Sequence, residues 1–238
     1  MLPIGEIVTD FKSPPHPKGI GLSGQHVEIV PLDAAAHAAS LYDAKSQDKD
    51  EVNWLYLPYG PFADLPAYQR WLEEMAALDD PAFFTLIRKS DQKAVGIASY
   101  LRIDQHNGSI EVGHIHFSPL LQNTTAATEA LFIMMRWAFE VGYRRFEWKC
   151  NALNLKSRKA AQRLGLSYEG IFRQMMIAKG RNRDTAWYAA IDKEWPALKQ
   201  AFESYLRDHN FDEQGKPRCS LTDMTKPLLF KIDDALSA

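Results

Sequence analysis

The sequence predicts an α/β (α+β) domain with a mixed central β-sheet of about six to seven strands and helices on both faces. Two observations support this prediction. Three β-rich runs follow one another at 83–89, 93–104 and 109–118, separated by short polar turns typical of hairpins. A long apolar-periodic helix at 124–141 then leads to a strand at 144–151, and such a unit normally joins parallel strands in a right-handed sense.

The segments before this unit fit the same architecture. Residues 26–33 alternate as a strand does, and an alanine-rich helix follows at 34–46. The loop at 53–62 is rich in aromatic residues and chain breakers, and the helix at 65–78 has one apolar face. Proline and glycine are frequent near the N-terminus, so we expect an extended arm over residues 1–25.

The segments after the unit complete the domain. A short helix is expected to end at Gly165, because glycine commonly closes helices. The predicted domain covers 26–207, and a polar tail follows at 208–238. The remaining expected elements are a helix at 155–165, strands at 167–180 and 183–192, and a helix at 194–208.

The composition is that of a soluble globular protein. Of 238 residues, 46% are hydrophobic and 24% are charged, and the net charge of -2 argues against nucleic-acid binding, which usually needs a basic excess. No apolar run approaches the roughly 18–20 residues that span a bilayer, and the N-terminus lacks a signal-peptide core. Cys150 and Cys219 form no disulfide framework, so we expect a cytoplasmic protein.

The turn that precedes the long helix has small side chains. It lies at the carboxyl end of a strand, where ligands of open sheets tend to bind. The first N–H groups of a helix lack intrahelical partners, and together with the helix dipole they attract phosphate. The run from Thr124 to Ala127 is small enough to leave these groups accessible. The alternative is that a threonine simply caps the helix and the alanines pack against the sheet.

This turn resembles the acyl-CoA-binding turn of the GNAT superfamily of N-acetyltransferases. The chain around the Asn154-x-x-Ser157 segment also resembles the RimJ/RimL-type branch, and the resemblance covers roughly 26–207. It implies the GNAT fold, acetyl-CoA as the donor, and direct acetyl transfer to an amine. The signature, a Gln or Arg, two residues, a Gly, one residue and a Gly or Ala, is matched by Gln122, Asn123, Thr124, Thr125, Ala126 and Ala127.

One residue departs from the family pattern. Thr125 stands where the first glycine is usual. A threonine tolerates the right-handed helical region but not positive φ, so the turn is expected to be helical at this position. Its Cβ also narrows the approach to a pyrophosphate, which would weaken or displace the cofactor.

The resemblance further implies contacts to the cofactor. The backbone N–H groups at 115–117 would polarise the thioester carbonyl, an oxyanion-type role. Ser157 would stabilise or protonate the leaving thiolate, and Arg158 would approach the CoA phosphates. Without the resemblance, the serine is an ordinary helix residue and the arginine a solvated one. Besides the turn, the predicted cofactor-binding residues are Ile115, His116, Phe117, Asn154, Ser157 and Arg158.

Glu111 is the candidate general base. It lies eleven positions before Gln122, which is the place of the catalytic glutamate in the histone-acetyltransferase branch, and such bases contribute about 10²- to 10⁴-fold. The alternative is an exposed sheet carboxylate. Strand alternation puts His114 and His116 on one face and Glu111 on the other. The two histidines lack a third metal ligand, so no metal is expected, although either histidine is an alternative base.

The acceptor site is expected in the aromatic loop and in the hairpin near 179–187. The hairpin resembles the one that the RimJ/RimL branch places beside the acceptor. Asp184 is a candidate ligand for an ammonium group, although a salt bridge to Arg181 or Arg183 is the competing interpretation. The loop residues form either a binding wall or a buried plug. These residues are Trp54, Tyr56, Tyr59 and Phe62.

Together these observations predict an acetyl-CoA-dependent N-acetyltransferase. The acceptor would be a primary amine, either a protein or peptide N-terminus or a small molecule, with a homodimer possible and no nucleic acid or membrane partner. The alternatives are an acyl-CoA-binding sensor with little catalysis and transfer of another acyl group.

Overall fold

The computed structural model describes residues 4–236, so the outermost ends of the predicted arm and tail lie outside the described residues. One mixed sheet has the strand order β1-β2-β3-β4-β5-β6-β8-β7. Its strands are β1 (Leu22–Ser23), β2 (Val27–Pro31), β3 (Ala82–Arg88), β4 (Lys93–Asp104), β5 (Ser109–Phe117), β6 (Arg145–Asn151), β7 (Ser167–Ala178) and β8 (Arg181–Ile191). Its helices are α1 (Ala34–Lys45), α2 (Leu65–Ala76), α3 (Thr125–Glu140), α4 (Leu155–Arg163), α5 (Trp195–Leu206) and α6 (Leu221–Thr225).

The predicted α/β architecture is confirmed, with eight strands rather than six or seven. The extra strand is β1, a two-residue segment of the predicted arm that pairs with the edge of β2. All neighbouring strands are antiparallel except β5 and β6, which flank α3 and run parallel as expected.

The first four helices along the chain each begin where the sequence provides a capping side chain. In each case an Asp, Asn or Thr side chain accepts a hydrogen bond from the backbone N–H three residues later, which satisfies one of the unpaired donors of the first turn. The capping residues are Asp33 in α1, Asp64 in α2, Thr124 in α3 and Asn154 in α4.

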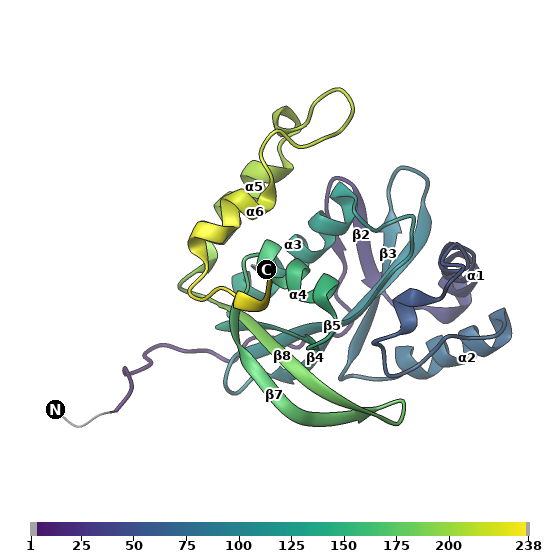
Figure 1. The fold of residues 1–238 in the computed structure, drawn as a ribbon, viewed down its shortest axis with the longest axis horizontal. Helices are drawn as coiled ribbons and strands as arrows, with labels where there is room; N and C mark the ends of the chain where they lie inside the picture. The colour runs from purple at the N-terminus through teal and green to yellow at the C-terminus, as the bar shows by residue number, and fades with distance from the viewer. Residues whose placement is uncertain (1–3, 237–238) are drawn as a thin grey trace.

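Two apolar cores cover the two faces of the sheet. The larger core contains most of α3 and residues of α4 and α5, and the smaller one joins α1 and α2 to β3 and β4. Figure 1 shows α1 and α2 together at one side of the molecule and α5 and α6 stacked at the other. The smaller core is built around Trp54, a 2% exposed residue of the loop between α1 and α2.

The sheet opens between β5 and β6. These strands pair from Ser109↔Arg145 only as far as Val112↔Trp148. Beyond this point β5 continues along β4 to Phe117, while β6 continues along β8 to Asn151. The parallel strands therefore separate toward their carboxyl ends, next to the start of α3.

A β-bulge in β5 lies at the point of separation. The register with β4 shifts between the pairs Ser99↔Gly113 and Ile97↔His116. His114 falls inside the bulge and has a φ of 50°, in the left-handed region that a residue with a Cβ rarely adopts. The bulge changes which side chains share a face of the sheet.

Both terminal segments contact the domain. In the arm, the hydroxyl of Ser13 donates to the Gln105 carbonyl at 2.8 Å, and that of Tyr143 donates to the Pro15 carbonyl at 3.0 Å. In the tail, Asp233 is buried against α4. The helices formed by residues 4–236 are all too short or too polar to cross a membrane.

Candidate active site

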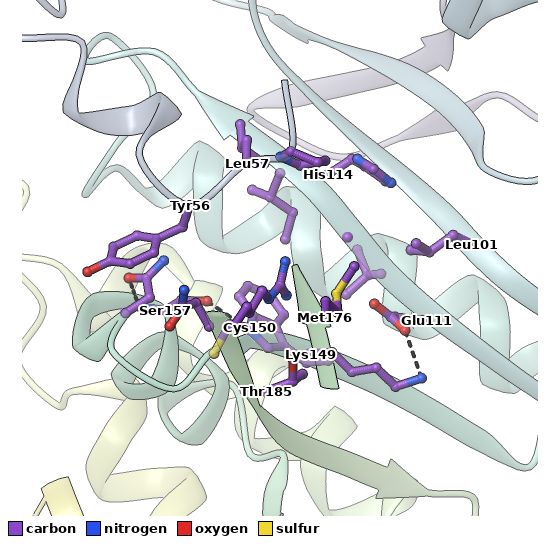
Figure 2. Close-up of a pocket in the computed structure, with 18 of the residues that line it drawn as sticks. Tyr56, Leu57, Leu101, Glu111, His114, Lys149, Cys150, Ser157, Met176 and Thr185 are labelled. Carbon is purple, nitrogen blue, oxygen red and sulfur yellow. Dashed lines mark hydrogen bonds and ion pairs between the residues drawn. The ribbon is translucent and has the colours of Figure 1, made fainter. Parts of the chain in front are cut away.

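A cavity lies where β5 and β6 separate. Side chains from both faces of the sheet line it. Along β6, Trp148 and Cys150 belong to the core on the α3 side, whereas Lys149 points to the opposite face because side chains alternate along a strand. Figure 2 shows Ser157 and Cys150 at one end of the cavity and Glu111 at the other. The cavity therefore crosses the sheet.

The α3-side end is organised by the start of α4. The side-chain oxygen of Asn154 accepts from the Ser157 N–H at 3.1 Å, and the Ser157 hydroxyl accepts from the indole N–H of Trp148 at 3.0 Å. Asn154, Ser157 and Cys150 all line the cavity. Burial raises the pKa of the Cys150 thiol, so this neighbour stays protonated at neutral pH. The Ser157 hydroxyl is thus held in place with its own proton free to donate.

The opposite end contains a buried carboxylate with two cations. Glu111 is 3% exposed, and one of its oxygens lies 2.7 Å from Arg102 and 2.9 Å from Lys149. Lys149 also pairs with Glu147 at 2.7 Å. Burial raises the pKa of Glu111 above its ordinary value, although Arg102 and Lys149 pull it down. Figure 2 shows the contact between Glu111 and Lys149 as a dashed line.

The expectation that Glu111 and the histidines face opposite sides of the sheet is wrong. Ile110 and Val112 belong to the core on the α3 side, so Glu111 between them points to the opposite face. His114 packs on Tyr59 of that same face, because the bulge adds a residue and reverses the alternation. His116 remains on the same side as His114 and stacks on Trp54 with ring centroids 3.8 Å apart. Burial lowers the pKa of both histidines to about 4, so both are neutral at pH 7.

The bulge also determines which residues of β5 have no paired residue on β4. His114 and Ile115 lie between the paired positions and have no Cα partner on β4. Ile115 lines the cavity. His116 and Phe117 are again in register with β4. Of the three N–H groups predicted to polarise a carbonyl, that of Ile115 is the one at the irregular, cavity-lining position.

The turn before α3 has the conformation expected from its sequence. Asn123 has a φ of 59°, and Thr124 caps the helix by accepting from the Ala127 N–H at 3.1 Å. Thr125 is the first helical residue, as predicted. Within residues 4–236, the N–H groups of Thr125 and Ala126 have no acceptor. These free donors at the start of a 16-residue helix fit a pyrophosphate.

A side-chain contact joins this turn to the cavity. The amide nitrogen of Gln122 donates to the Asn53 side chain at 2.8 Å and to the Phe117 carbonyl at 2.8 Å. Asn53 lines the cavity. The helix terminus and the opening between the strands therefore belong to one continuous site.

The structure places Arg158 away from this site. Its guanidinium donates to Asp233 at 2.8 and 2.6 Å and to the Ala152 carbonyl at 2.9 Å, and it is 5% exposed. All three guanidinium nitrogens are thus engaged within the protein. The arginine therefore fixes the C-terminal tail to α4, and the expected phosphate contact finds no support.

The residues of the aromatic loop have different positions: one lines the cavity, and others are packed into the smaller core. Tyr56 lines the cavity, and its hydroxyl donates to the Leu153 carbonyl at 3.2 Å, so the loop reaches across to the start of α4. Trp54 and Phe62 pack against each other and against α2, which makes them a plug. Tyr59 is a support, because its hydroxyl lies 2.9 Å from Nδ1 of His114.

Asp184 is not placed to hold an acceptor. Its carboxylate accepts from the Gln174 N–H at 2.7 Å and from the Asn182 amide at 3.0 Å. Gln174 has a φ of 52° and lies where the pairing of β7 and β8 is irregular. Asp184 thus stabilises this irregularity of β7. It forms no salt bridge with the neighbouring arginines of the described chain.

Sequence reasoning missed the polar side chains that surround Glu111. The sequence did indicate three of them, because positions 183, 185 and 187 alternate along an expected strand and their side chains must therefore share one face. Which face that is depends on the sheet order, which places β8 beside β6. The missed cavity-lining residues are Asn53, Arg102, Lys149, Arg183, Thr185 and Trp187.

In the described part of the chain, no group of three or more His, Cys, Asp or Glu side chains is arranged to hold a metal.

Comparison with known proteins identifies the family. The family model described as an acetyltransferase (GNAT) domain matches residues 26–167, and it is of the RimJ/RimL type, as the resemblance implied. A GCN5-related N-acetyltransferase from Brucella melitensis has a TM-score of 0.89 at 41% identity, covering 92% of this chain and 100% of that one.

Two further relatives agree. The N-acetyltransferase YnaD of Bacillus subtilis is 25% identical over 141 residues, 59% of this chain and 81% of YnaD. The self-immunity acetyltransferase MccE, solved with acetyl-CoA and AMP, shares the fold with a TM-score of 0.62 at 20% identity, covering 71% of this chain and 93% of that one. The chain therefore belongs to the GNAT family of N-acetyltransferases, which use acetyl-CoA.

Proposed function

We propose that this protein transfers an acetyl group from acetyl-CoA directly to a primary amine, with Glu111 as the general base. The observation that supports this proposal is the cavity that crosses the sheet, with Ser157 at one end and Glu111 at the other. A donor entering from the α3 side and an acceptor entering from the opposite face would meet between β5 and β6. This arrangement needs no covalent enzyme intermediate.

Glu111 is suited to deprotonating an ammonium group. Its pKa is raised by burial, which brings it closer to that of an amine than an exposed carboxylate would be. Acetyl-CoA supplies the activated acetyl group. The Glu111 carboxylate takes one proton from the ammonium group and later releases it to solvent. The neutral amine nitrogen then forms a bond to the acetyl carbon as the carbon–sulfur bond breaks. The second proton, which the nitrogen loses on bond formation, ends on the departing thiolate: the Ser157 hydroxyl donates its proton to the sulfur and takes up this one in return.

The free N–H groups of Thr125 and Ala126 are proposed to hold the pyrophosphate. The helix dipole adds about half a positive charge at this terminus. Asn154 and Ser157 are proposed to contact the pantetheine arm, and the Ile115 N–H to polarise the thioester carbonyl. Tyr56 is proposed to form the acceptor wall, because it lies over the cavity and bridges to the start of α4.

The test is a two-substrate kinetic study. Thiol release from acetyl-CoA is followed with a panel of primary amines and N-terminal peptides, and the acetylated products are identified by mass spectrometry. Direct transfer predicts intersecting double-reciprocal lines, whereas a covalent acetyl-enzyme would give parallel lines. Binding of acetyl-CoA without turnover of any amine would instead favour a sensor, and faster turnover with a longer acyl-CoA would identify another donor.

A further inference from the structure

Strand β8 presents three hydrogen-bond donors to the cavity without partners. Arg183, Thr185 and Trp187 alternate along the strand and all line the cavity. The Arg183 Nε, the Thr185 hydroxyl and the Trp187 indole nitrogen are buried, and none has a hydrogen-bond partner. Thr185 is 3% exposed. Buried donors without acceptors are unfavourable in a folded protein. Three of them on one strand face therefore indicate that a ligand supplies the acceptors.

Two of the three cations that line the cavity of the described chain are paired with a carboxylate, and the third is not. The nearby cations Arg102 and Lys149 both pair with Glu111. Among residues 4–236, Arg183 is the cavity-lining cation for which no carboxylate lies within salt-bridge distance. Burial, and to a smaller extent the neighbouring Arg102, lower the pKa of Arg183 although Glu111 raises it, so the charged guanidinium is unfavourably placed without a ligand.

The three donors share a face of the sheet with the proposed base. Lys149 is paired with Trp187 and contacts Glu111, which places β8 beside the base on the side opposite α3. Glu111 is also close enough to act electrostatically on Arg183. The opening beyond the pair Val112↔Trp148 separates β5 from β6 and β8 at this level, and Glu111 and the three donors line the single cavity that it forms. A small acceptor therefore reaches both groups.

We propose that Arg183, together with Thr185 and Trp187, binds a carboxylate on the acceptor, so that the substrate is an amine that also carries a carboxylate. This inference rests on the proposed function. A guanidinium matches a carboxylate in geometry, and one unpaired cation balances one negative charge better than the two charges of a phosphate monoester. Met175 and Met176 line the same cavity, and their flexible side chains can rearrange around the ligand.

The test compares acceptors that differ only in the anionic group. The twenty standard amino acids are assayed with acetyl-CoA against their carboxamides and decarboxylated amines, and β-alanine is assayed against phosphoethanolamine. Peptides that begin with Ala-Asp and Ala-Asn distinguish a peptide carboxylate from that of a free amino acid. We expect kcat/KM to be about 10- to 100-fold higher for the carboxylate member of the best pair, mainly through KM.

Variants of β8 connect this preference to the structure. Arg183→Gln is expected to remove the preference, so that the ratio of kcat/KM for the carboxylate amine to that for the decarboxylated amine falls to about 1, mainly through a higher KM for the carboxylate amine. Arg183→Lys should restore part of this preference. Arg181→Gln is the matched control, because Arg181 is an exposed residue of the same strand outside the cavity.

Different results would overturn the carboxylate inference and the proposed acetyltransferase function. Equal turnover of both members of each pair, a preference for phosphoethanolamine, or a carboxylate preference that survives Arg183→Gln would overturn this inference and leave the acetyltransferase activity standing. Turnover of no amine by a protein that binds acetyl-CoA would overturn the proposed function, and this inference with it.

Discussion

At the scale of single residues, the site depends on how two neighbouring glutamates differ. Glu111 and Glu147 are paired across β5 and β6 and both contact Lys149. Glu111 lines the cavity and has a pKa raised by burial. Glu147 is also held by Arg145 at 2.6 Å, and its hydrogen bonds to Lys149 and Arg145 lower its pKa despite burial. The position in the cavity together with the raised pKa therefore supports Glu111, and not Glu147, as the proposed base.

The first prediction follows from this contrast. Glu111→Gln should lower kcat by about 10²- to 10⁴-fold, with little change in KM for acetyl-CoA, because only proton transfer is lost. Glu147→Gln removes a carboxylate from the same lysine outside the cavity, so it serves as the control and should retain most activity. Steady-state kinetics of both variants decide the matter. Equal losses would show that charge around Lys149, and not a base at position 111, controls the rate.

The second prediction concerns pH. The base must be ionised, so activity should fall as pH decreases through the raised pKa of Glu111, above the ordinary carboxyl range. Lys149 lowers this pKa, so Lys149→Gln should move the acid limb of the kcat profile to higher pH. Profiles of kcat against pH for both proteins measure the shift. A limb that stays in place or moves to lower pH would contradict the assignment.

At the scale of elements, the start of α3 combines a cap with a free donor pair. The cap of Thr124 satisfies the Ala127 N–H, while Thr125 and Ala126 leave theirs unpaired. The structural interpretation of this turn is therefore confirmed, and it is compatible with the proposed phosphate site, because the two use different N–H groups of the same helix turn.

The third prediction separates these two roles. Thr125→Glu places a negative charge at the helix N-terminus, which should stabilise the fold by about 0.3–1 kcal/mol. The same charge should repel the CoA pyrophosphate and raise the dissociation constant of CoA by about 10-fold or more. Thr125→Gln provides the uncharged control. Urea unfolding and calorimetric titration with CoA measure the two effects. Unchanged CoA affinity in the glutamate variant would mean that the phosphates bind elsewhere.

At the scale of the whole molecule, a buried ion pair joins the C-terminal tail to the active-site side of the sheet. Arg158 directly follows Ser157 and pairs with Asp233, which is 1% exposed. The Tyr188 hydroxyl of β8 also donates to this aspartate. The tail thus fixes the first turn of α4, which carries Ser157 and Asn154.

The fourth prediction tests this connection. Arg158→Met should reduce the free energy of unfolding by about 3–5 kcal/mol, because it leaves a buried carboxylate without its partner. The double variant Arg158→Met/Asp233→Leu should recover much of this loss, since both charges are then absent. Lys199→Met breaks the exposed pair with Glu140 and should cost about 1 kcal/mol or less. Urea denaturation compares the three. A small effect of Arg158→Met would show that the pair does not hold the tail in solution.

The two faces of the sheet carry different parts of the proposed site. The α3 side carries the larger core and the proposed donor site, while the other face carries Glu111 and the donors of β8. The opening between β5 and β6 connects them. The proposed active site therefore lies where β5 and β6 separate, and not on a single surface of the sheet.

The sequence by itself determined the elements, because their signals are local. Hydrophobic periodicity, capping residues and turns placed nearly every helix and strand within a few residues of its observed bounds. The turn around Thr125 was also predictable, since a helix terminus and its cap need only a few consecutive residues. Strand β1 was missed because two residues carry no periodic pattern.

Only the tertiary structure decided what surrounds Glu111. The bulge at His114 reversed the alternation of side chains between the two faces of the sheet, and no pattern in the sequence predicted this bulge. Arg158 pairs with Asp233, 75 residues away in the sequence, and Asp184 accepts from the backbone of Gln174 on the neighbouring strand, whereas their charges alone suggested phosphate and ammonium. Local sequence specifies backbone conformation, whereas the environment of a charged side chain depends on strand order, register and burial, which arise when the whole sheet assembles.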